Sequence, residues 1–114
     1  MQIDIQSRGF KLTDALFGYA QRRMLYALTY CSGHVNRVVI RLSDINGPRG
    51  GADKRCHIQV VLAGIPDVVV EHTEVDLYAA IDKAIKRTKS SVVRKVDRHL
   101  TRHTQNNTRL LEQE

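Results

Sequence analysis

The feature that most constrains the fold of this chain is a helical pattern that begins near Val75 and continues for roughly thirty residues, about eight turns at 3.6 residues per turn. Apolar residues recur along one side of it, and a helix of this kind needs a second layer against which to bury that side. We therefore expect one long amphipathic helix packed on another structural layer. Its predicted apolar stripe consists of Leu77, Ile81, Ile85, Thr88, Val92, Val96 and either His99 or Leu100.

The other layer is predicted from segments in which apolar and polar residues alternate, the pattern of half-buried strands. Residues 35–43 show it best, because Val38, Ile40 and Leu42 alternate with Arg37, Val39 and Arg41. The expected strands are residues 2–6, 35–43, 56–62 and 67–72, and a tight reversal over residues 63–66 joins the last two.

A second helix is predicted between the first two strands, with Thr13 as its N-cap and Asp14 in its first turn. Its expected apolar face is Leu16, Phe17, Ala20, Met24, Ala27 and Leu28, while Tyr19, Arg22 and Tyr26 point away. The order β-α-β-β-β-α predicts an α+β fold: a two-layer sandwich with both helices packed on one face of a four-stranded antiparallel sheet. The open face of that sheet would carry Arg37, Arg41, His57 and Gln59.

Length and composition predict one globular domain with an excess of positive charge. Of 114 residues, 18 are Lys or Arg and 12 are Asp or Glu, for a formal net charge of +6. We expect the domain to span residues 1–103 and residues 104–114 to form a flexible tail. The start of the chain lacks the pattern of a secretory signal and no segment is apolar enough to cross a membrane, which predicts a cytoplasmic protein with two free cysteines.

The charge excess is concentrated on the long helix, on the side opposite its apolar stripe. Like charges four residues apart, such as Lys83 with Arg87, repel weakly, so helix stability does not require them. A polyanion would turn this repulsion into attraction, which favours an RNA or DNA surface over the alternative of a solvated helix face. The candidate RNA-binding residues are Arg22, Arg23, Arg37, Arg41, Lys83, Lys86, Arg87, Lys89, Arg94, Lys95 and Arg98.

Other chemistries find little support in the sequence. Cys31, His34, Cys56 and His57 lack the spacing of zinc ligands, and neighbouring Cys56 and His57 should face opposite sides of a strand. The glycine-rich segment 46–51 lacks the phosphate-binding glycine-lysine pattern. It is expected to form a flexible hairpin loop that bears Arg49, Lys54 and Arg55. We therefore expect no metal, no cofactor, no small-molecule substrate and no enzymatic activity. The four tyrosines could stack on bases or simply pack: Tyr19, Tyr26, Tyr30 and Tyr78.

The run Asp76-Leu77-Tyr78-Ala79-Ala80-Ile81-Asp82, followed by a basic amphipathic helix, resembles the signature of the ribosome hibernation-promoting factor family. This family includes the ribosome-associated inhibitor A proteins and was formerly named for sigma-54 modulation. The resemblance extends from Met1 to about His103, and the segment from Asn46 to Cys56 is similar to short members of the family.

The resemblance implies a stress protein that binds small-subunit ribosomal RNA at the subunit interface and blocks the mRNA and tRNA channel. It further implies that basic residues of the two helices make the RNA contacts and that the chain is monomeric off the ribosome. An alternative function from another class is a protein-interaction regulator, of the sigma-54 modulation type, that uses the open sheet face or the glycine loop.

Overall fold

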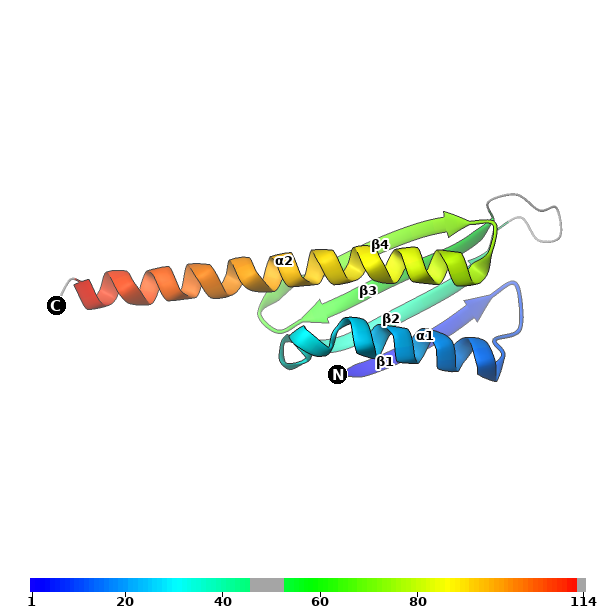
Figure 1. The fold of residues 1–114 in the computed structure, drawn as a ribbon, viewed down its shortest axis with the longest axis horizontal. Coiled ribbons are helices and arrows are strands. Elements are labelled where there is room, and N and C mark those ends of the chain that lie inside the picture. The colour runs from blue at the N-terminus through cyan, green and yellow to red at the C-terminus, as the bar shows by residue number, and fades with distance from the viewer. Residues whose placement is uncertain (46–52, 113–114) are drawn as a thin grey trace.

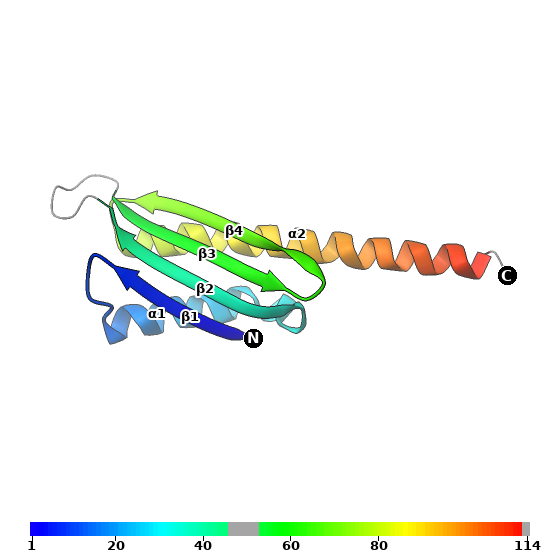
Figure 2. The ribbon, with the colours of Figure 1, turned by 180° about the vertical axis from the view of Figure 1, so that it is seen from behind.

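The computed structural model describes residues 1–45 and 53–112, with side chains described as far as residue 101. The elements are β1 (Gln2–Arg8), α1 (Asp14–Ala27), the 3₁₀ helix η1 (Thr29–His34), β2 (Val35–Asp44), β3 (Lys54–Leu62), β4 (Ile65–Glu74) and α2 (Leu77–Glu112). Both α-helices lie on one side of the sheet (Figure 1), and Figure 2 shows that its other side is uncovered. The predicted α+β two-layer sandwich is confirmed.

The sheet itself differs from the prediction, because it is mixed and not antiparallel. Its strand order is β1-β2-β3-β4, and β1 pairs parallel to β2 while the other two pairs are antiparallel. A parallel neighbour needs a crossover connection, and α1 supplies it by carrying the chain back along the sheet between β1 and β2. The pattern of alternating residues is the same for parallel and antiparallel strands, so it could not predict the parallel pair.

The inward-facing side chains of the sheet form the centre of the core. Ile40 of β2 lies opposite Ile58 of β3, and Ile58 lies opposite Val70 of β4; all three are buried. The β3–β4 turn is tighter than predicted, because it consists of Ala63 and Gly64 and β4 already begins at Ile65. Gly64 adopts a left-handed backbone conformation with φ of 71°, which only glycine adopts without strain in such a turn.

Helix α1 begins as predicted, with the side chain of Thr13 accepting a 3.2 Å hydrogen bond from the amide of Leu16. Leu16, Ala20 and Met24 are buried beneath the helix. The placement of Phe17 in the apolar face was wrong, since this side chain is 38% exposed. Tyr19 is half-buried and faces α2. Phe17 precedes it by two residues, which corresponds to a rotation of about 200° around the helix, so Phe17 points to the opposite flank.

Helix α2 buries most of the predicted stripe along β3 and β4, including Ile81, Val92 and Val96. His99 and Leu100 are exposed, contrary to the prediction. The sheet ends at the β3–β4 turn, which lies beside Lys95 and His99, and the helix continues beyond it (Figure 1). The backbone of α2 remains helical to Glu112. Flexibility of residues 104–114 stays a prediction.

The predicted glycine-rich loop, with Arg49, falls largely in residues 46–52, which lie outside the described residues. Lys54 and Arg55, which were expected in this loop, belong to β3 instead. Lys54 donates a 2.9 Å hydrogen bond to Asp44 of β2 and lies 3.4 Å from Asp53. The hydrogen bond to Asp44 is the main reason that the pKa of the Lys54 ammonium is raised. These contacts tie the start of β3 to the end of β2.

Candidate nucleic-acid interface

One carboxylate of α2 binds two side chains of α1. Asp82 of α2 accepts a 2.6 Å hydrogen bond from the Tyr19 hydroxyl and lies 3.3 Å from Nε of Arg23, and both of these partners belong to α1. The hydrogen bond to Asp82, together with desolvation, raises the pKa of Tyr19. Arg23, a predicted RNA-binding residue, is therefore already paired within the chain.

The motif that carries the family resemblance has a clear structural role. Asp76 caps α2, because its side chain accepts a 3.2 Å hydrogen bond from the amide of Ala79. Tyr78 meets Tyr19 edge to face, with ring centroids 4.9 Å apart, and Ala80 and Ile81 are fully buried. The run from Asp76 to Asp82 therefore starts α2 and docks it against α1. The capping role of Asp76 was missed in the sequence, although an aspartate just before a helical pattern is a known signal for it.

Three of the predicted basic residues on α2 turn toward the edge strand β4. Lys83 donates a 2.6 Å hydrogen bond to the Glu74 carboxylate, which holds the pKa of Glu74 below its ordinary value, and His72 contributes through a second contact to the same oxygen. Arg87 and Lys95 donate to the main-chain carbonyls of Glu71 and Asp67, at 3.3 and 3.2 Å. A carbonyl does not neutralise a cation, so of these three only Lys83 has its charge balanced at close range.

A second group of predicted basic residues has no hydrogen-bond or ion-pair partner among the residues that the structure describes: Arg22, Arg41, Lys86, Lys89, Arg94 and Arg98. All six side chains are exposed. Arg22 lies on α1, Arg41 lies on the open sheet face, and the other four follow the exposed side of α2 over about three turns. Arg37, also on the sheet face, pairs with Asp4 at 2.6 Å.

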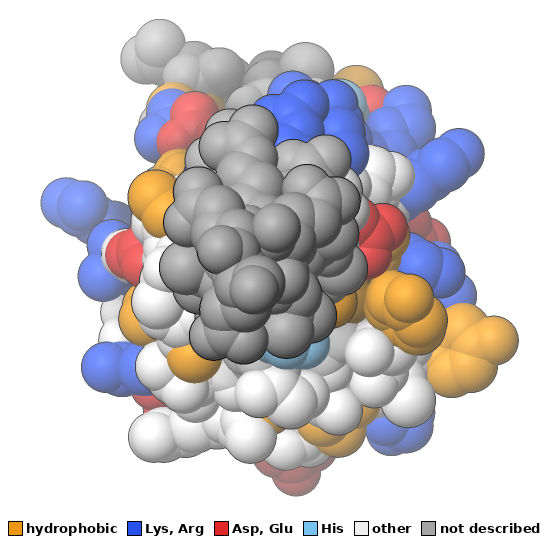
Figure 3. All heavy atoms as spheres, turned by 90° about the vertical axis from the view of Figure 1, so that its left-hand side faces the viewer, with side chains coloured by type: hydrophobic (Ala, Val, Ile, Leu, Met, Phe, Trp, Pro, Cys, Tyr) orange, Lys and Arg blue, Asp and Glu red, His pale blue; other side chains and the backbone are white. Residues whose placement is uncertain are grey.

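Positive side chains are not confined to one face of the molecule. Figure 3 views the molecule from the side at which α2 ends. Lys and Arg side chains project on more than one side of the molecule in this view, with Asp and Glu side chains among them. The separation of a basic from an apolar side was predicted for α2 alone, and it does not extend to the rest of the domain. Charge alone does not select the docking face, and the shape of the surface has to be considered with it.

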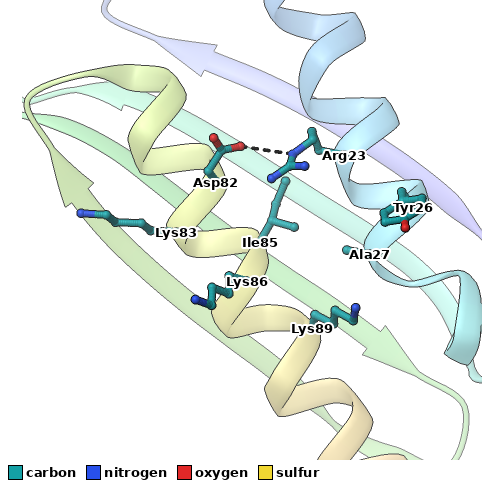
Figure 4. Close-up of a pocket in the computed structure, with 8 residues that line it drawn as sticks. All are labelled: Arg23, Tyr26, Ala27, Asp82, Lys83, Ile85, Lys86 and Lys89. Atoms are coloured by element: carbon teal, nitrogen blue, oxygen red, sulfur yellow. Dashed lines mark hydrogen bonds and ion pairs between the residues drawn. The ribbon is translucent and has the colours of Figure 1, made fainter.

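The surface of α2 carries two adjoining hollows that are bordered by unpaired cations. One of about 300 Å³ lies between α1 and α2, with Tyr26 and Arg23 on one wall and Lys86 and Lys89 on the other (Figure 4). In this view Lys89 extends toward the C-terminal end of α1, whereas Lys83 and Lys86 point away from α1. The second hollow, of about 530 Å³, is bordered by the three cations Lys86, Lys89 and Arg94 and by one carboxylate, Asp97. A cationic, uneven surface of this kind suits a folded polyanion.

Within the described part of the chain, no three His, Cys, Asp or Glu side chains gather in the manner of metal ligands. Burial raises the pKa of the Cys56 thiol to about 12, and it also raises that of Cys31. Both groups are therefore protonated and inert at neutral pH. Among the same described residues, no helix has the length and apolar character needed to cross a membrane.

Comparison with known proteins agrees with this architecture. A solved N-terminal domain of Protein Y from Thermus thermophilus is 33% identical, with a TM-score of 0.68 over 82% of this chain and 98% of that chain. A ribosomal subunit interface protein from Coxiella burnetii is 15% identical and shares the fold, with a TM-score of 0.69 over 82% of this chain and 96% of that chain. A search of curated protein sequences gave no match.

A family model described as sigma 54 modulation protein / S30EA ribosomal protein matches residues 3–105, nearly the whole of the described sandwich. The match includes α1, α2 as far as residue 105, the four strands from residue 3 onward and the run from Asp76 to Asp82. The family consists of ribosome-associated regulators that are not enzymes. The chain belongs to the sigma 54 modulation protein / S30EA ribosomal protein family.

Proposed function

We propose that this chain is a hibernation factor, a translation inhibitor that docks on small-subunit ribosomal RNA at the subunit interface. In this proposal its bulk excludes mRNA and tRNA under stress. The observation that carries it is the row of unneutralised cations on the exposed side of α2, formed by Lys86, Lys89, Arg94 and Arg98. Each phosphate that a Lys or Arg neutralises releases condensed counterions, so such a row favours binding to RNA.

The rest of the fold supports a steric mechanism. The two helices share one core with the sheet, and Asp82 joins them to each other, so the cations are presented on a preformed surface. A preformed surface binds without a large ordering cost, and phosphate contacts are enough to set its position on RNA. Blocking a channel requires volume and affinity but no turnover. The subunit-interface location is suggested by the name of the Coxiella burnetii relative.

The partners that this proposal assigns are the small ribosomal subunit and its RNA, with no membrane and no small-molecule substrate. We further propose a cytoplasmic location and a monomeric state away from the ribosome. Among the predicted RNA-binding residues, those on the helix side are placed in the interface. Lys83 and Arg23 make weaker candidates than Lys86 and Arg94, because their charges are already balanced by Glu74 and Asp82.

The experiment that tests the proposal is co-sedimentation with 30S and 70S ribosomes at several salt concentrations. The variant Lys86→Ala/Arg94→Ala removes two unpaired cations from α2, and the matched control Arg8→Ala/Lys11→Ala removes two exposed cations near the end of β1. We expect the α2 variant to bind more weakly, with a log–log salt slope that is shallower by about 2, roughly one unit for each phosphate that is no longer neutralised. The control should retain the slope of the unmodified protein.

Two results would count against the proposal. Equal losses of affinity in the two variants would mean that binding depends on net charge and not on the α2 surface. Failure of the unmodified protein to sediment with ribosomes at low salt would remove the ribosome as its partner. Inhibition is tested in parallel by adding the protein to a cell-free translation reaction, where the α2 variant should inhibit less at equal concentration.

A further inference from the structure

The hollow between α1 and α2 has features that a general phosphate-binding surface does not need. Its floor is apolar, because Ala27 and Ile85 both line it and are 8% and 4% exposed. Tyr26 stands at its edge with 80% of its surface exposed (Figure 4). An aromatic ring in water beside a small apolar floor suggests a binding site for a flat, aromatic group.

The structure divides the four tyrosines into a packed pair and an exposed pair, a distinction that the sequence left open. Tyr19 and Tyr78 pack against each other edge to face, and the Tyr19 hydroxyl is bound to Asp82, so these two serve the contact between the helices. Tyr26 and Tyr30 are 80% and 77% exposed, and neither has a ring partner among the described residues. Of these two, only Tyr26 lines the hollow. Its ring is therefore free to receive a ligand at that place.

The charges around the hollow favour an anionic group next to the aromatic one. Lys86 and Lys89 both line the hollow from α2, and neither has an ion-pair partner within the described residues. Of the two, Lys89 extends toward α1 (Figure 4). The one carboxylate of the hollow, Asp82, is already bound by Tyr19 and Arg23. Its volume of about 300 Å³ lies at the small end of the roughly 300–1,000 Å³ range of small-ligand sites. One nucleotide fits these dimensions better than a segment of duplex.

We propose that this hollow binds a single unpaired nucleotide of RNA, with its base stacked on Tyr26 above Ala27 and Ile85 and its phosphate held by Lys89. The inference rests on the proposed function, since it assumes that the partner is RNA, and it adds a specific requirement for an unstacked base. Proteins recognise single-stranded RNA by stacking splayed bases on aromatic rings, which a paired base inside a helix cannot reach. The docking site should therefore include a bulged or looped-out nucleotide.

The test measures binding of a fluorescein-labelled six-nucleotide single-stranded RNA and of a blunt-ended, fully paired RNA duplex by fluorescence anisotropy at low salt. Tyr26→Ala should lower the affinity for the single strand by between about 5-fold and about 150-fold, the range expected when one base–aromatic stack is removed. Its affinity for the duplex should change by less than about 2-fold, because phosphate contacts remain. Tyr26→Phe keeps the ring and should bind the single strand like the unmodified protein.

Tyr30→Ala is the matched control, because this tyrosine is equally exposed but does not line the hollow. It should leave single-strand binding unchanged. An equal drop in affinity for Tyr30→Ala and Tyr26→Ala, or no drop for Tyr26→Ala, would overturn the proposal. Far-ultraviolet circular dichroism of each variant establishes that the fold is intact.

Sedimentation with ribosomes separates this inference from the proposed function. If the unmodified protein sediments with ribosomes but the single strand binds equally well to Tyr26→Ala, the nucleotide site is wrong and the proposed function stands. If the unmodified protein fails to bind ribosomes, the proposed function fails, whereas a selective loss of single-strand binding in Tyr26→Ala would still support the nucleotide site.

Discussion

The Tyr19 hydroxyl of α1 donates a 2.6 Å hydrogen bond to the Asp82 carboxylate of α2, so that two residues 63 positions apart in the chain join the helical layer. Arg23 binds the same oxygen of Asp82 from one turn further along α1. Together with the ring contact between Tyr19 and Tyr78, this side chain helps to set the relative position of the helices and the width of the hollow between them. The contact gives Asp82, one of two acidic residues among the many basic ones of α2 up to residue 101, a role in packing the helices.

Replacement of Tyr19 by Phe removes this hydrogen bond and leaves the ring in place. A hydrogen bond to a charged group contributes about 1.5–3 kcal/mol, and we expect a decrease of about 1 kcal/mol in the free energy of unfolding because Arg23 continues to satisfy Asp82. Urea unfolding followed by circular dichroism measures the change. Tyr26→Phe is the control, because this exposed side chain should change stability by less than about 0.5 kcal/mol. Equal stability of the two variants would disprove the role of the Tyr19 hydroxyl.

A second prediction compares Gly64 of the β3–β4 turn with Gly33 of η1, because the two glycines differ in backbone conformation. Gly64 has φ of 71°, and alanine at such an angle costs about 1–2 kcal/mol. Gly33 in η1 does not have a positive φ, and a Cβ atom added there would meet no heavy atom within 4 Å. Gly64→Ala should therefore lower the free energy of unfolding by about 1 kcal/mol, while Gly33→Ala should leave it unchanged or raise it by up to about 1 kcal/mol. Thermal unfolding of both variants tests this, and a larger decrease for Gly33→Ala would contradict it.

The contacts of Glu74 predict a dependence of stability on pH. A hydrogen bond from Lys83 holds the pKa of Glu74 below its ordinary value of 4.5, and a hydrogen bond from His72 makes a smaller contribution in the same direction. A carboxyl group with a lowered pKa in the folded state stabilises that state at pH values above its unfolded pKa, and this stabilisation is lost as pH falls through the folded pKa. Replacing Glu74 by Gln should therefore reduce stability at pH 7 and have a smaller effect at pH 3.

Nuclear magnetic resonance of the Glu74 side-chain carboxyl carbon measures the same contact directly. The pKa of Glu74 should lie below 4.5 in the unmodified protein and should rise toward that value in Lys83→Met, which keeps an unbranched side chain, one atom shorter, without its charge. A pKa that does not respond to Lys83→Met would show that this hydrogen bond is absent in solution.

Much of the fold could be predicted because the decisive patterns are local. Alternation along β2 assigned Val38, Ile40 and Leu42 to the core, and the helical period assigned Ile81, Ile85 and Val92; all six are buried. The parallel pairing of β1 with β2 was missed, because alternation reports which face of a strand is buried and not which neighbour it pairs with. The exposure of His99 and Leu100 was missed because it depends on where the sheet ends beside α2.

The candidate interface was predicted less completely, because partners from other elements are not visible in a helical period. A helical wheel places Lys83, Arg87 and Arg94 together, whereas in the structure the first two contact β4 and only Arg94 has no partner within the described residues. The hollow between the helices likewise requires knowing that Tyr26 of α1 lies across from Lys89 of α2. Such a contact between distant segments is set by the packing of the two layers.

The two arginines of the open sheet face allow the proposed docking face to be tested against its opposite. Arg37 pairs with Asp4 at 2.6 Å, and Arg41 is exposed, so replacing both by Ala removes the same formal charge as Lys86→Ala/Arg94→Ala. A rigid two-layer domain presents one face at a time to a folded RNA, so the two variants should not weaken ribosome binding equally. If the helices dock, the sheet-face variant should shift the log–log salt slope by less than about 1, against about 2 for the α2 variant. The reverse order would place the RNA on the uncovered sheet and leave the cations of α2 as a solvated surface.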